Sequence, residues 1–201
     1  KLVVLILALT QFTVVLDFMV MSPLGDLLMK SMSITPTQFG IVVSCYAFSA
    51  GVSGFLTAGF ADKFDRKKLL LFFYLGFIIG TFLCGIVNSY PLLVLARIVT
   101  GVFGGVISSI SMAIVADLFE LNQRGRVMGF LQMGFGVSQV LGIPISLWFA
   151  YRWGWQSPFF VIVGLASLIS LVGIIFLKPV TAHIAVQKDK PLLHLFKTIQ
   201  N

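Results

Sequence analysis

Two ionisable residues, Asp17 and Arg97, lie inside long apolar stretches of the sequence. A charge in hydrocarbon is costly, so an ionisable residue within a membrane span is by default a functional candidate with a partner to be found. If the first span runs outward and the fourth inward, a rise of ~1.5 Å per residue places Asp17 roughly 15 Å and Arg97 roughly 8 Å below the outer boundary. These depths allow a carboxylate–guanidinium pair if the two spans adjoin.

Two interpretations of this pair remain open. In the first, it is a static ion pair that pins two helices together. In the second, the Asp17 carboxylate gains and loses a proton, and Arg97 stabilises its charged form until substrate or a conformational change separates the two groups. The second interpretation makes the pair a proton-coupling site.

Further polar and small residues recur at helical spacing around these two charges. Thr10, Thr13 and Asp17 share one helical face, because their spacings are four and three. Two other stripes consist of Arg97, Gly101, Gly104 or Gly105, and Ser108, and of Gln132, Gln139 and Ser146. A polar stripe in lipid faces other helices or a water-filled cavity, so Thr13, Ser108, Gln132 and Gln139 are candidates for lining a substrate cavity. For the Gly–Ser stripe, close helix packing is the alternative.

The composition indicates that lipid is the solvent of this chain. Hydrophobic residues make up 58% of the 201 residues and charged residues only 10%, and the mean hydropathy is +1.03. One soluble core could not hide so much apolar side chain. The net charge of +7 could suggest nucleic acid, but the basic residues fall in loops, where membrane orientation and anionic headgroups explain them. No nucleic-acid partner is therefore expected.

Catalysis and metal binding have little support in the sequence. Cys45 and Cys84 both fall inside apolar runs and are interpreted as small apolar side chains. His183 and His194 lie in the polar tail, without metal-ligand spacing. No nucleophile–base set is visible either, so we expect no metal site, no cofactor and no enzymatic activity.

Six spans of near the ~20 residues that a bilayer requires are predicted. They cover approximately residues 2–27, 37–61, 69–87, 92–119, 127–151 and 158–177. The second span has a clear start signal, since Thr35 and Gln38 can form a capping box around Pro36. In the fifth span, Pro144 should bend the helix and leave the carbonyl near Val140 free. Pro179 ends the sixth span, because proline disfavours helix in the residue before it.

Charge in the loops predicts the orientation. The stretch 59–68 reads GFADKFDRKK, and most other loop Lys and Arg residues fall on the same side. Loops rich in Lys and Arg stay cytoplasmic, which places both ends of the chain in the cytoplasm. Residues 1–178 thus form a six-helix bundle, and residues 179–201 are either a cytoplasmic linker or a surface amphipathic helix. We favour the linker, and because the chain lacks an initial methionine and stops in a polar segment, we expect it to be part of a longer one.

The loop between the second and third spans carries the strongest resemblance to a known family. With Asp62, Lys63 and Arg66 in their usual positions, it resembles the gate loop in the first half of a major facilitator superfamily transporter, most closely the proton-coupled drug efflux branch. Asp65 stands where that family usually has glycine, and has the charge to compete for Arg66 or to weaken the turn. The resemblance implies a cytoplasmic gate in which Arg66 meets an acid at the end of span four. The residues of this gate would be Gly59, Asp62, Lys63, Arg66, Lys67 and Asp117.

Three further stretches resemble motifs of the same family. Arg97–Gly101 resembles an Arg-x-x-Gln-Gly motif linked to proton coupling, with Thr100 in place of glutamine. Leu16–Pro23 is similar to a Leu-Asp…Pro motif of drug exporters. Gly142-Ile143-Pro144 matches an antiporter motif in part. The resemblance therefore implies proton coupling at Asp17 and Arg97, and helix bending or packing at Gly101, Gly105, Gly142 and Pro144.

The expected protein is an all-α integral membrane protein, one half of a twelve-helix carrier. The expected activity is proton-coupled efflux of small amphipathic compounds by alternating access, in the cell inner (plasma) membrane. Its partners would be a small-molecule substrate, protons, the lipid bilayer and a second six-helix half. One alternative is a carrier of the same fold for a sugar or another small metabolite, in either direction. A second alternative is a membrane scaffold or sensor that transports nothing.

Overall fold

The computed structural model describes residues 2–58 and 61–180, and all of its regular structure is helical. The elements are α1 (Leu2–Val20), α2 (Gly25–Met32), α3 (Pro36–Ala58), η1 (Ala61–Lys63), α4 (Arg66–Ile86), α5 (Tyr90–Leu118), α6 (Leu121–Val137), the π-helix η2 (Ser138–Gly142), α7 (Ile143–Trp153) and α8 (Ser157–Phe176). Within the described ranges, six helical segments are long and apolar enough to cross a membrane. The prediction of an all-helical chain with six spans is therefore confirmed. Residues 181–201, where the linker was predicted, lie outside the described ranges.

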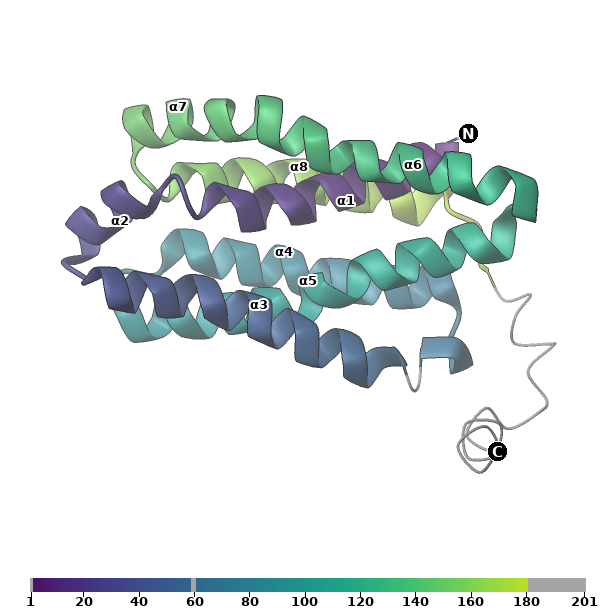
Figure 1. Ribbon diagram of the computed structural model, residues 1–201, viewed down its shortest axis with the longest axis horizontal. Coiled ribbons are helices and arrows are strands. Elements are labelled where there is room, and N and C mark those ends of the chain that lie inside the picture. Colours follow the sequence, from purple (N-terminus) through teal and green to yellow (C-terminus); the bar gives the residue numbers. More distant parts are fainter. Residues whose placement is uncertain (1, 59–60, 181–201) are drawn as a thin grey trace.

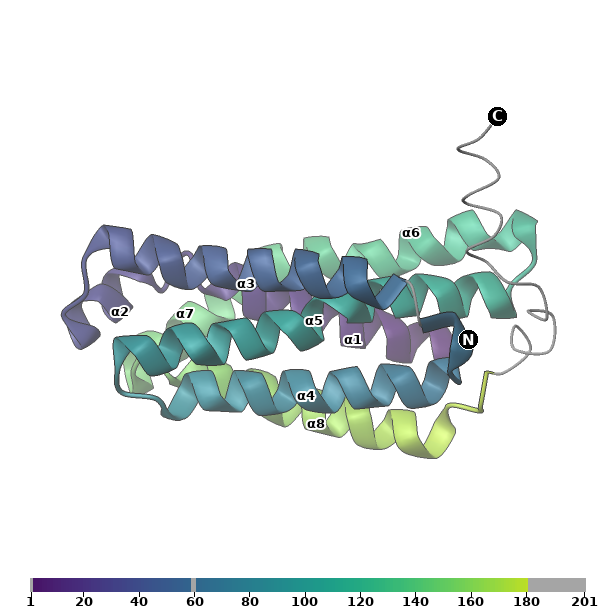
Figure 2. The ribbon, with the colours of Figure 1, turned by 90° about the horizontal axis from the view of Figure 1, so that it is seen from below.

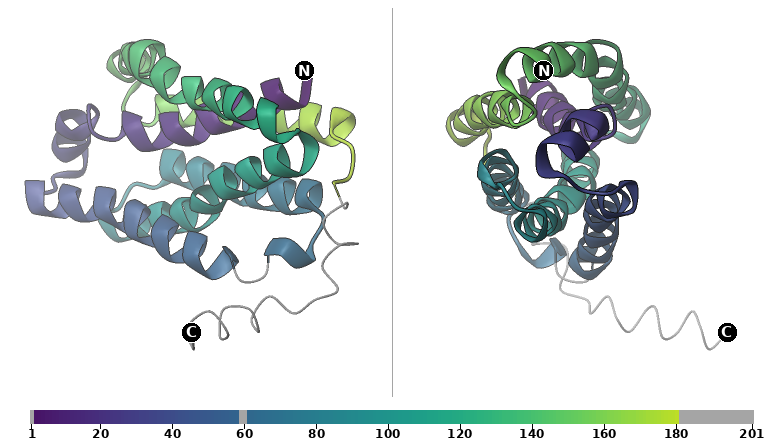
Figure 3. Two further views of the ribbon diagram at one scale, coloured as in Figure 1. Left: turned by 45° about the vertical axis from the view of Figure 1, so that its right-hand side comes forward. Right: turned by 90° about the vertical axis from the view of Figure 1, so that its left-hand side faces the viewer.

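The long helices lie side by side, and the start of α1 and the end of α8 are at the same end of the bundle (Figure 1). Viewed along the bundle, they form two groups (Figure 3). The first group contains α3, α4 and α5, with α5 packed against the other two. The second group contains α1, the α6–η2–α7 segment and α8, with α1 packed against both. Figure 2 shows α3, α5, α4 and α8 as successive neighbours, so α4 and α8 connect the groups on one side.

The first span is shorter than the sequence predicted, because the helix ends at Val20 instead of near residue 27. Pro23 has no N–H to donate and its ring clashes with the preceding turn, which disfavours a continuous helix there. The chain turns and continues as the short helix α2, which ends at Ser33 in the left-handed conformation (φ 53°). The indole Nε1 of Trp155 donates to the Ser31 hydroxyl at 2.9 Å, and this bond connects α2 to the α7–α8 loop.

The start of α3 follows the capping box that the sequence predicted. The backbone N–H of Thr35 donates to Gln38 Oε1 at 2.9 Å, and the N–H of Gln38 donates to Thr35 Oγ1 at 3.3 Å. Pro36 occupies the first helical position, where its missing N–H costs nothing. This reciprocal bonding confirms the predicted start signal of the second span.

The fifth span is interrupted where Pro144 predicted a bend. A π-helix replaces one α-turn over Ser138–Gly142, and the N–H of Ile143 donates to the carbonyl of Ser138, five residues earlier. Pro144 follows directly at the start of α7. Since a proline cannot donate to the carbonyl four residues before it, a wider turn at this point is the local way to accommodate the missing bond.

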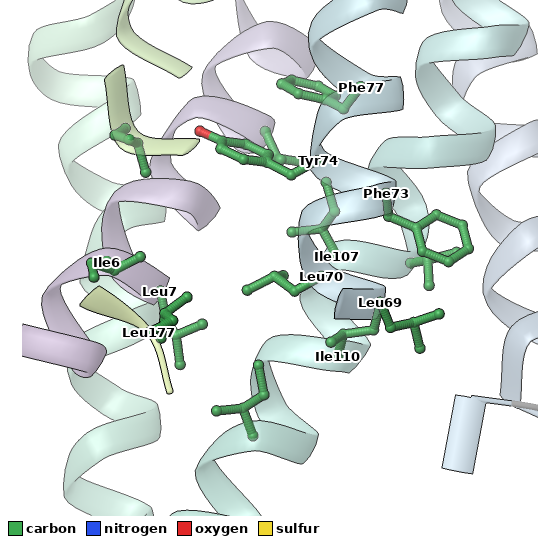
Figure 4. Packing of buried hydrophobic residues seen from close by; sticks show 14 of the residues in the cluster. Ile6, Leu7, Leu69, Leu70, Phe73, Tyr74, Phe77, Ile107, Ile110 and Leu177 are labelled. Carbon is green, nitrogen blue, oxygen red and sulfur yellow. The ribbon is translucent and has the colours of Figure 1, made fainter. Parts of the chain in front are cut away.

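Two clusters of buried apolar side chains form the core of the bundle. One cluster includes Ile6, Leu7, Leu70, Ile107 and Leu177, drawn in Figure 4. The other is built from residues nearer the opposite end of the same helices, including Leu16, Val20, Cys84, Leu93 and Ala96. Lipid supplies little hydrophobic drive for helix association, so shape and polar contacts decide which helices adjoin.

Glycines on α5 let its neighbours approach closely. A Cβ added at Gly101 would overlap the Tyr46 carbonyl and the Ser49 hydroxyl of α3, and one at Gly105 would overlap the Ala50 backbone. Gly101 and Gly105 of the Gly–Ser stripe thus form a packing surface against α3, as small residues do at many membrane helix contacts. Gly142 likewise faces the Leu16 side chain of α1.

Candidate functional site

The Asp17 carboxylate and the Arg97 guanidinium form a salt bridge in the middle of the bundle. Arg97 Nη1 donates to Asp17 Oδ2 at 2.8 Å, and both side chains have 0% of their surface exposed. Asp17 comes from α1 and Arg97 from α5, so the helices that carry the two charges do adjoin. The structure therefore brings these two predicted residues together.

This pair lies at the seam, the boundary where α1 of the second group meets α4 and α5 of the first. Two other polar contacts cross the same boundary. Ser108 of α5 donates to Gln11 Oε1 at 2.9 Å, and the hydroxyls of Thr13 and Tyr74 of α4 are 2.8 Å apart. Polar contacts therefore hold α1 at the seam along much of its length. A boundary held by few, specific hydrogen bonds can exist in two discrete arrangements.

The salt bridge leaves part of its bonding capacity unused. Among the described residues, Asp17 Oδ1 and Arg97 Nε and Nη2 have no hydrogen-bond partner. The buried Thr81 hydroxyl of α4 also makes no hydrogen bond within the described chain. A buried charge with unmet hydrogen bonds is costly, so the environment of this pair makes it energetically sensitive to any change at either group.

Tyr46 of α3 belongs to the same site, although it was not among the residues predicted from the sequence. The centre of its ring lies 4.4 Å from the guanidinium carbon of Arg97. The other neighbour of this ring is Phe18, with centroids 5.3 Å apart and planes tilted by 28°. Tyr46 is one of 4 tyrosines and 20 phenylalanines in the chain, most of which face packing or lipid. Spacing alone could not distinguish it from them.

The predicted cavity residues differ in where they lie. Thr13 is fully buried against Tyr74, and Ser108 is half-buried and bonded to Gln11. Gln132 and Gln139 are exposed on the surface of the described bundle.

The third polar stripe does not hold together as one face. Ser146 is buried whereas Gln132 and Gln139 are exposed. The π-helix inserts a residue into the turn before Ser146, and so shifts the register on which the spacing of seven depended. The interpretation of these three residues as one stripe is therefore wrong.

The charged loop carries a second ion pair. Arg66 Nε donates to Asp117 Oδ2 at 3.3 Å, with side-chain exposures of 8% and 18%. This contact joins the N-terminus of α4 to the C-terminus of α5, the two ends that the resemblance paired. Lys63 is exposed in η1. Gly59 and the side chain of Asp62 lie outside what the structure describes.

Asp65 has a structural role that was not predicted from the sequence. Its Oδ1 accepts from the N–H of Lys67 at 2.9 Å, which caps α4, and from the N–H of Val180 at 3.1 Å. The N–H of Arg66 donates to the Val180 carbonyl at 3.3 Å, and Lys67 Nζ donates to the Ile174 carbonyl at 2.9 Å. The loop thus binds the end of α8 and the first residues after it.

The sequence is similar to those of several known proteins. A family model described as Major Facilitator Superfamily matches residues 7–199. An uncharacterised MFS-type transporter of Bacillus subtilis, YceJ, is 30% identical over 81% of this chain and 41% of its own. The multidrug resistance protein fnx1 of Schizosaccharomyces pombe is 32% identical over 69% of this chain and 26% of its own. A probable sugar efflux transporter of Helicobacter pylori is 26% identical over 78% and 40%, respectively. The chain spans less than half the length of each of these relatives.

A solved structure has the same fold. The xylose transporter XylE from E. coli, in a partially occluded inward open conformation, superposes with a TM-score of 0.80 at 17% identity. The match covers 92% of this chain and 51% of that one. In the part of the chain that the structure describes, no group of three His, Cys, Asp or Glu side chains could hold a metal ion.

Proposed function

The chain belongs to the Major Facilitator Superfamily, a family of transporters rather than enzymes, and we propose that it is the N-terminal half of a proton-coupled exporter. Its substrates would be small amphipathic compounds, and a second six-helix half would complete the carrier. The buried Asp17–Arg97 pair is the observation that carries this proposal. The names of a multidrug resistance protein and a sugar efflux transporter among its relatives support export.

In the proposed cycle, one proton and the substrate alternate at the seam. The charged Asp17 carboxylate holds Arg97 and keeps α1 and α5 together. A proton arriving from outside neutralises Asp17 and weakens its attraction to Arg97, which favours the other arrangement of the two groups. Release of that proton to the cytoplasm restores the pair, and substrate moves outward in exchange.

The Arg66–Asp117 pair would act at the cytoplasmic end of the same change. It lies at the rim of the bundle, where a charge pair is worth little in itself but can tip two nearly balanced conformations. The proposed orientation, with both ends of this half in the cytoplasm, follows from the Lys- and Arg-rich loops. The proposed location is the plasma membrane.

A transport assay on the complete carrier in proteoliposomes tests the proposal. Wild-type protein should drive an amphipathic dye or drug against its gradient when a pH gradient is imposed. Asp17→Asn and Arg97→Ala should abolish pH-driven transport while Asp17→Asn retains exchange of substrate between equal pools. Asp26→Asn, which changes an exposed carboxylate of α2, should behave as wild type. If both seam variants keep full pH-driven transport, the coupling assignment fails.

The direction and the substrate class are tested in the same vesicles. Accumulation inside inverted vesicles, where the cytoplasmic face is outward, indicates export. Assays with a labelled sugar in place of the amphipathic compound address the second candidate, a sugar exporter, which is motivated by the name of the Helicobacter pylori relative. Sugar transport without dye transport would replace the proposed substrate class.

A further inference from the structure

We propose that Tyr46 is a positioning residue that holds the Arg97 guanidinium on its ring face while Asp17 is neutral. This inference rests on the proposed function and adds α3 to a site whose two charges come from α1 and α5. The guanidinium carbon lies 4.4 Å from the ring centre, within the range in which the negative face of an aromatic ring attracts a cation. Tyr46 is 95% buried, so no water screens this attraction.

Residues of α1 and α5 determine the position of the Tyr46 ring. Phe18, the residue after Asp17 on α1, stacks on Tyr46 with centroids 5.3 Å apart. A Cβ added at Gly104 would lie 2.8 Å from the Tyr46 hydroxyl, so the missing side chain there makes room for the ring. Gly101 admits the Tyr46 backbone in the same way. The small residues of α5 thus allow α3 to place an aromatic face against Arg97.

Arg97 needs such a partner at one step of the proposed cycle. The titratable groups that face it are Asp17 of α1, Tyr46 of α3 and Cys84 of α4. Once Asp17 is protonated, no anion remains among these three groups. Two of the guanidinium nitrogens already lack hydrogen bonds among the described residues. The Tyr46 ring is then the group best placed to stabilise the buried cation and keep it near the seam, ready to pair again.

The proposed role of Tyr46 belongs to its aromatic ring and does not require its hydroxyl group. A ring face without a hydroxyl still attracts a cation, whereas an aliphatic side chain does not. Without the ring, neutral Asp17 would leave Arg97 with no partner, so protonation should become harder. The expected consequence is a pH profile displaced towards lower pH.

The first experiment measures pH-driven transport by the complete carrier across external pH. Tyr46→Phe should keep the rate within about twofold and keep the midpoint of the profile. Tyr46→Leu should move the midpoint by about one unit to lower pH, a roughly tenfold weaker hold on the proton. Phe55→Leu, at an 83%-exposed aromatic of the same helix, should leave the profile unchanged. An unchanged midpoint in folded Tyr46→Leu would overturn the proposal.

A second experiment keeps the proposal testable if Tyr46→Leu fails to fold. Phenylalanine with one, two or three ring fluorines at position 46 preserves the size of the ring while weakening its negative face. The midpoint should move to lower pH with each added fluorine. A profile that ignores ring electronics would show that the ring only fills space.

A third measurement distinguishes failure of this inference from failure of the proposed function. Thermal unfolding of Asp17→Asn, Tyr46→Leu and the double variant gives their coupling independently of transport. With Asp17 already neutral, loss of the ring should lower the melting temperature more than it does in wild type. Additive effects would contradict the ring–guanidinium contact. Non-additive effects with pH-driven transport retained by Asp17→Asn would contradict the proposed function alone.

Discussion

The chain contains two Asp–Arg pairs of similar chemistry in different surroundings. Asp17 and Arg97 meet at 2.8 Å with both side chains fully buried, whereas Arg66 and Asp117 meet at 3.3 Å with 8% and 18% exposed. Removing the arginine of the buried pair leaves an uncompensated carboxylate in a dry interior, whereas the partly exposed Asp117 can still be hydrated when Arg66 is lost. In the proposed function the buried pair responds to a proton, and the rim pair biases a conformation.

The two pairs should differ most in how much stability the protein loses when the arginine of each pair is replaced by alanine. Arg97→Ala should lower the free energy of unfolding by about 3–5 kcal/mol near neutral pH, because Asp17 is left buried and unpaired. Arg66→Ala, the matched control, should cost about 1 kcal/mol or less. Thermal or denaturant unfolding of the purified protein in detergent measures both. Equal losses would mean that burial does not separate the two pairs.

Replacing both partners of the buried pair sharpens that result. Asp17→Asn combined with Arg97→Met removes both charges, and this should recover most of the stability lost in Arg97→Ala. The double variant should still lack pH-driven transport. Recovered stability together with retained coupling would place the proton elsewhere.

The next largest effect concerns the helix contact that brings α3 to the buried pair. Gly101→Ala forces a methyl group onto the Tyr46 carbonyl, which should cost about 1–3 kcal/mol of stability through overpacking. Gly129→Ala is the control, since an added Cβ there meets nothing within 4 Å. That control should be neutral or gain up to about 1 kcal/mol from helix propensity. If the two alanines have similar effects in melting experiments, close approach of α3 and α5 is not required.

Near the rim pair, Asp65 should contribute through hydrogen bonds rather than an ion pair. Asp65→Ala removes the cap of α4 and the acceptor for the Val180 N–H, and should cost about 1 kcal/mol. Glu120→Ala is a matched control, since Glu120 occupies the same position before α6 but makes no capping bond. Its effect on the melting temperature should be near zero. Comparable losses from the two variants would show that Asp65 does not hold the chain after α8.

The smallest effect is the response of the two pairs to salt. A double-mutant cycle on Arg66 and Asp117 should give about 0.2–1 kcal/mol at low ionic strength, falling towards zero at 1 M salt. The same cycle on Asp17 and Arg97 should be insensitive to salt, because ions cannot enter the buried seam. A salt-sensitive buried pair would indicate that the seam is open to water.

The features that could be predicted from the sequence are those that depend on residues close together in the chain. The six spans and the Thr35–Gln38 capping box were predictable, because hydropathy and capping depend on neighbours in sequence. The similar depth of Asp17 and Arg97 followed from the fixed rise of a helix. Pro23 was a local signal for an interruption of the first span, but the predicted end of that span near residue 27 was wrong, because the helix ends at Val20.

The remaining features depend on which helices lie next to each other. The spacing of residues along the sequence does not predict these neighbours. The placement of the Tyr46 ring on Arg97 requires α3 to lie on the glycines of α5. The Asp65–Val180 bond joins residues 115 apart in the chain. The third polar stripe failed because the π-helix changed the register before Ser146.

The most direct test of the central claim is to observe the protonation of Asp17 itself. Infrared difference spectra of the complete carrier in lipid nanodiscs, recorded across pH, report the stretch of a protonated carboxyl group. The account predicts a band that appears as the pH falls, disappears in Asp17→Asn, and changes its midpoint in Arg97→Lys. A spectrum identical in wild type and Asp17→Asn would show that Asp17 never takes up a proton, and would contradict the account.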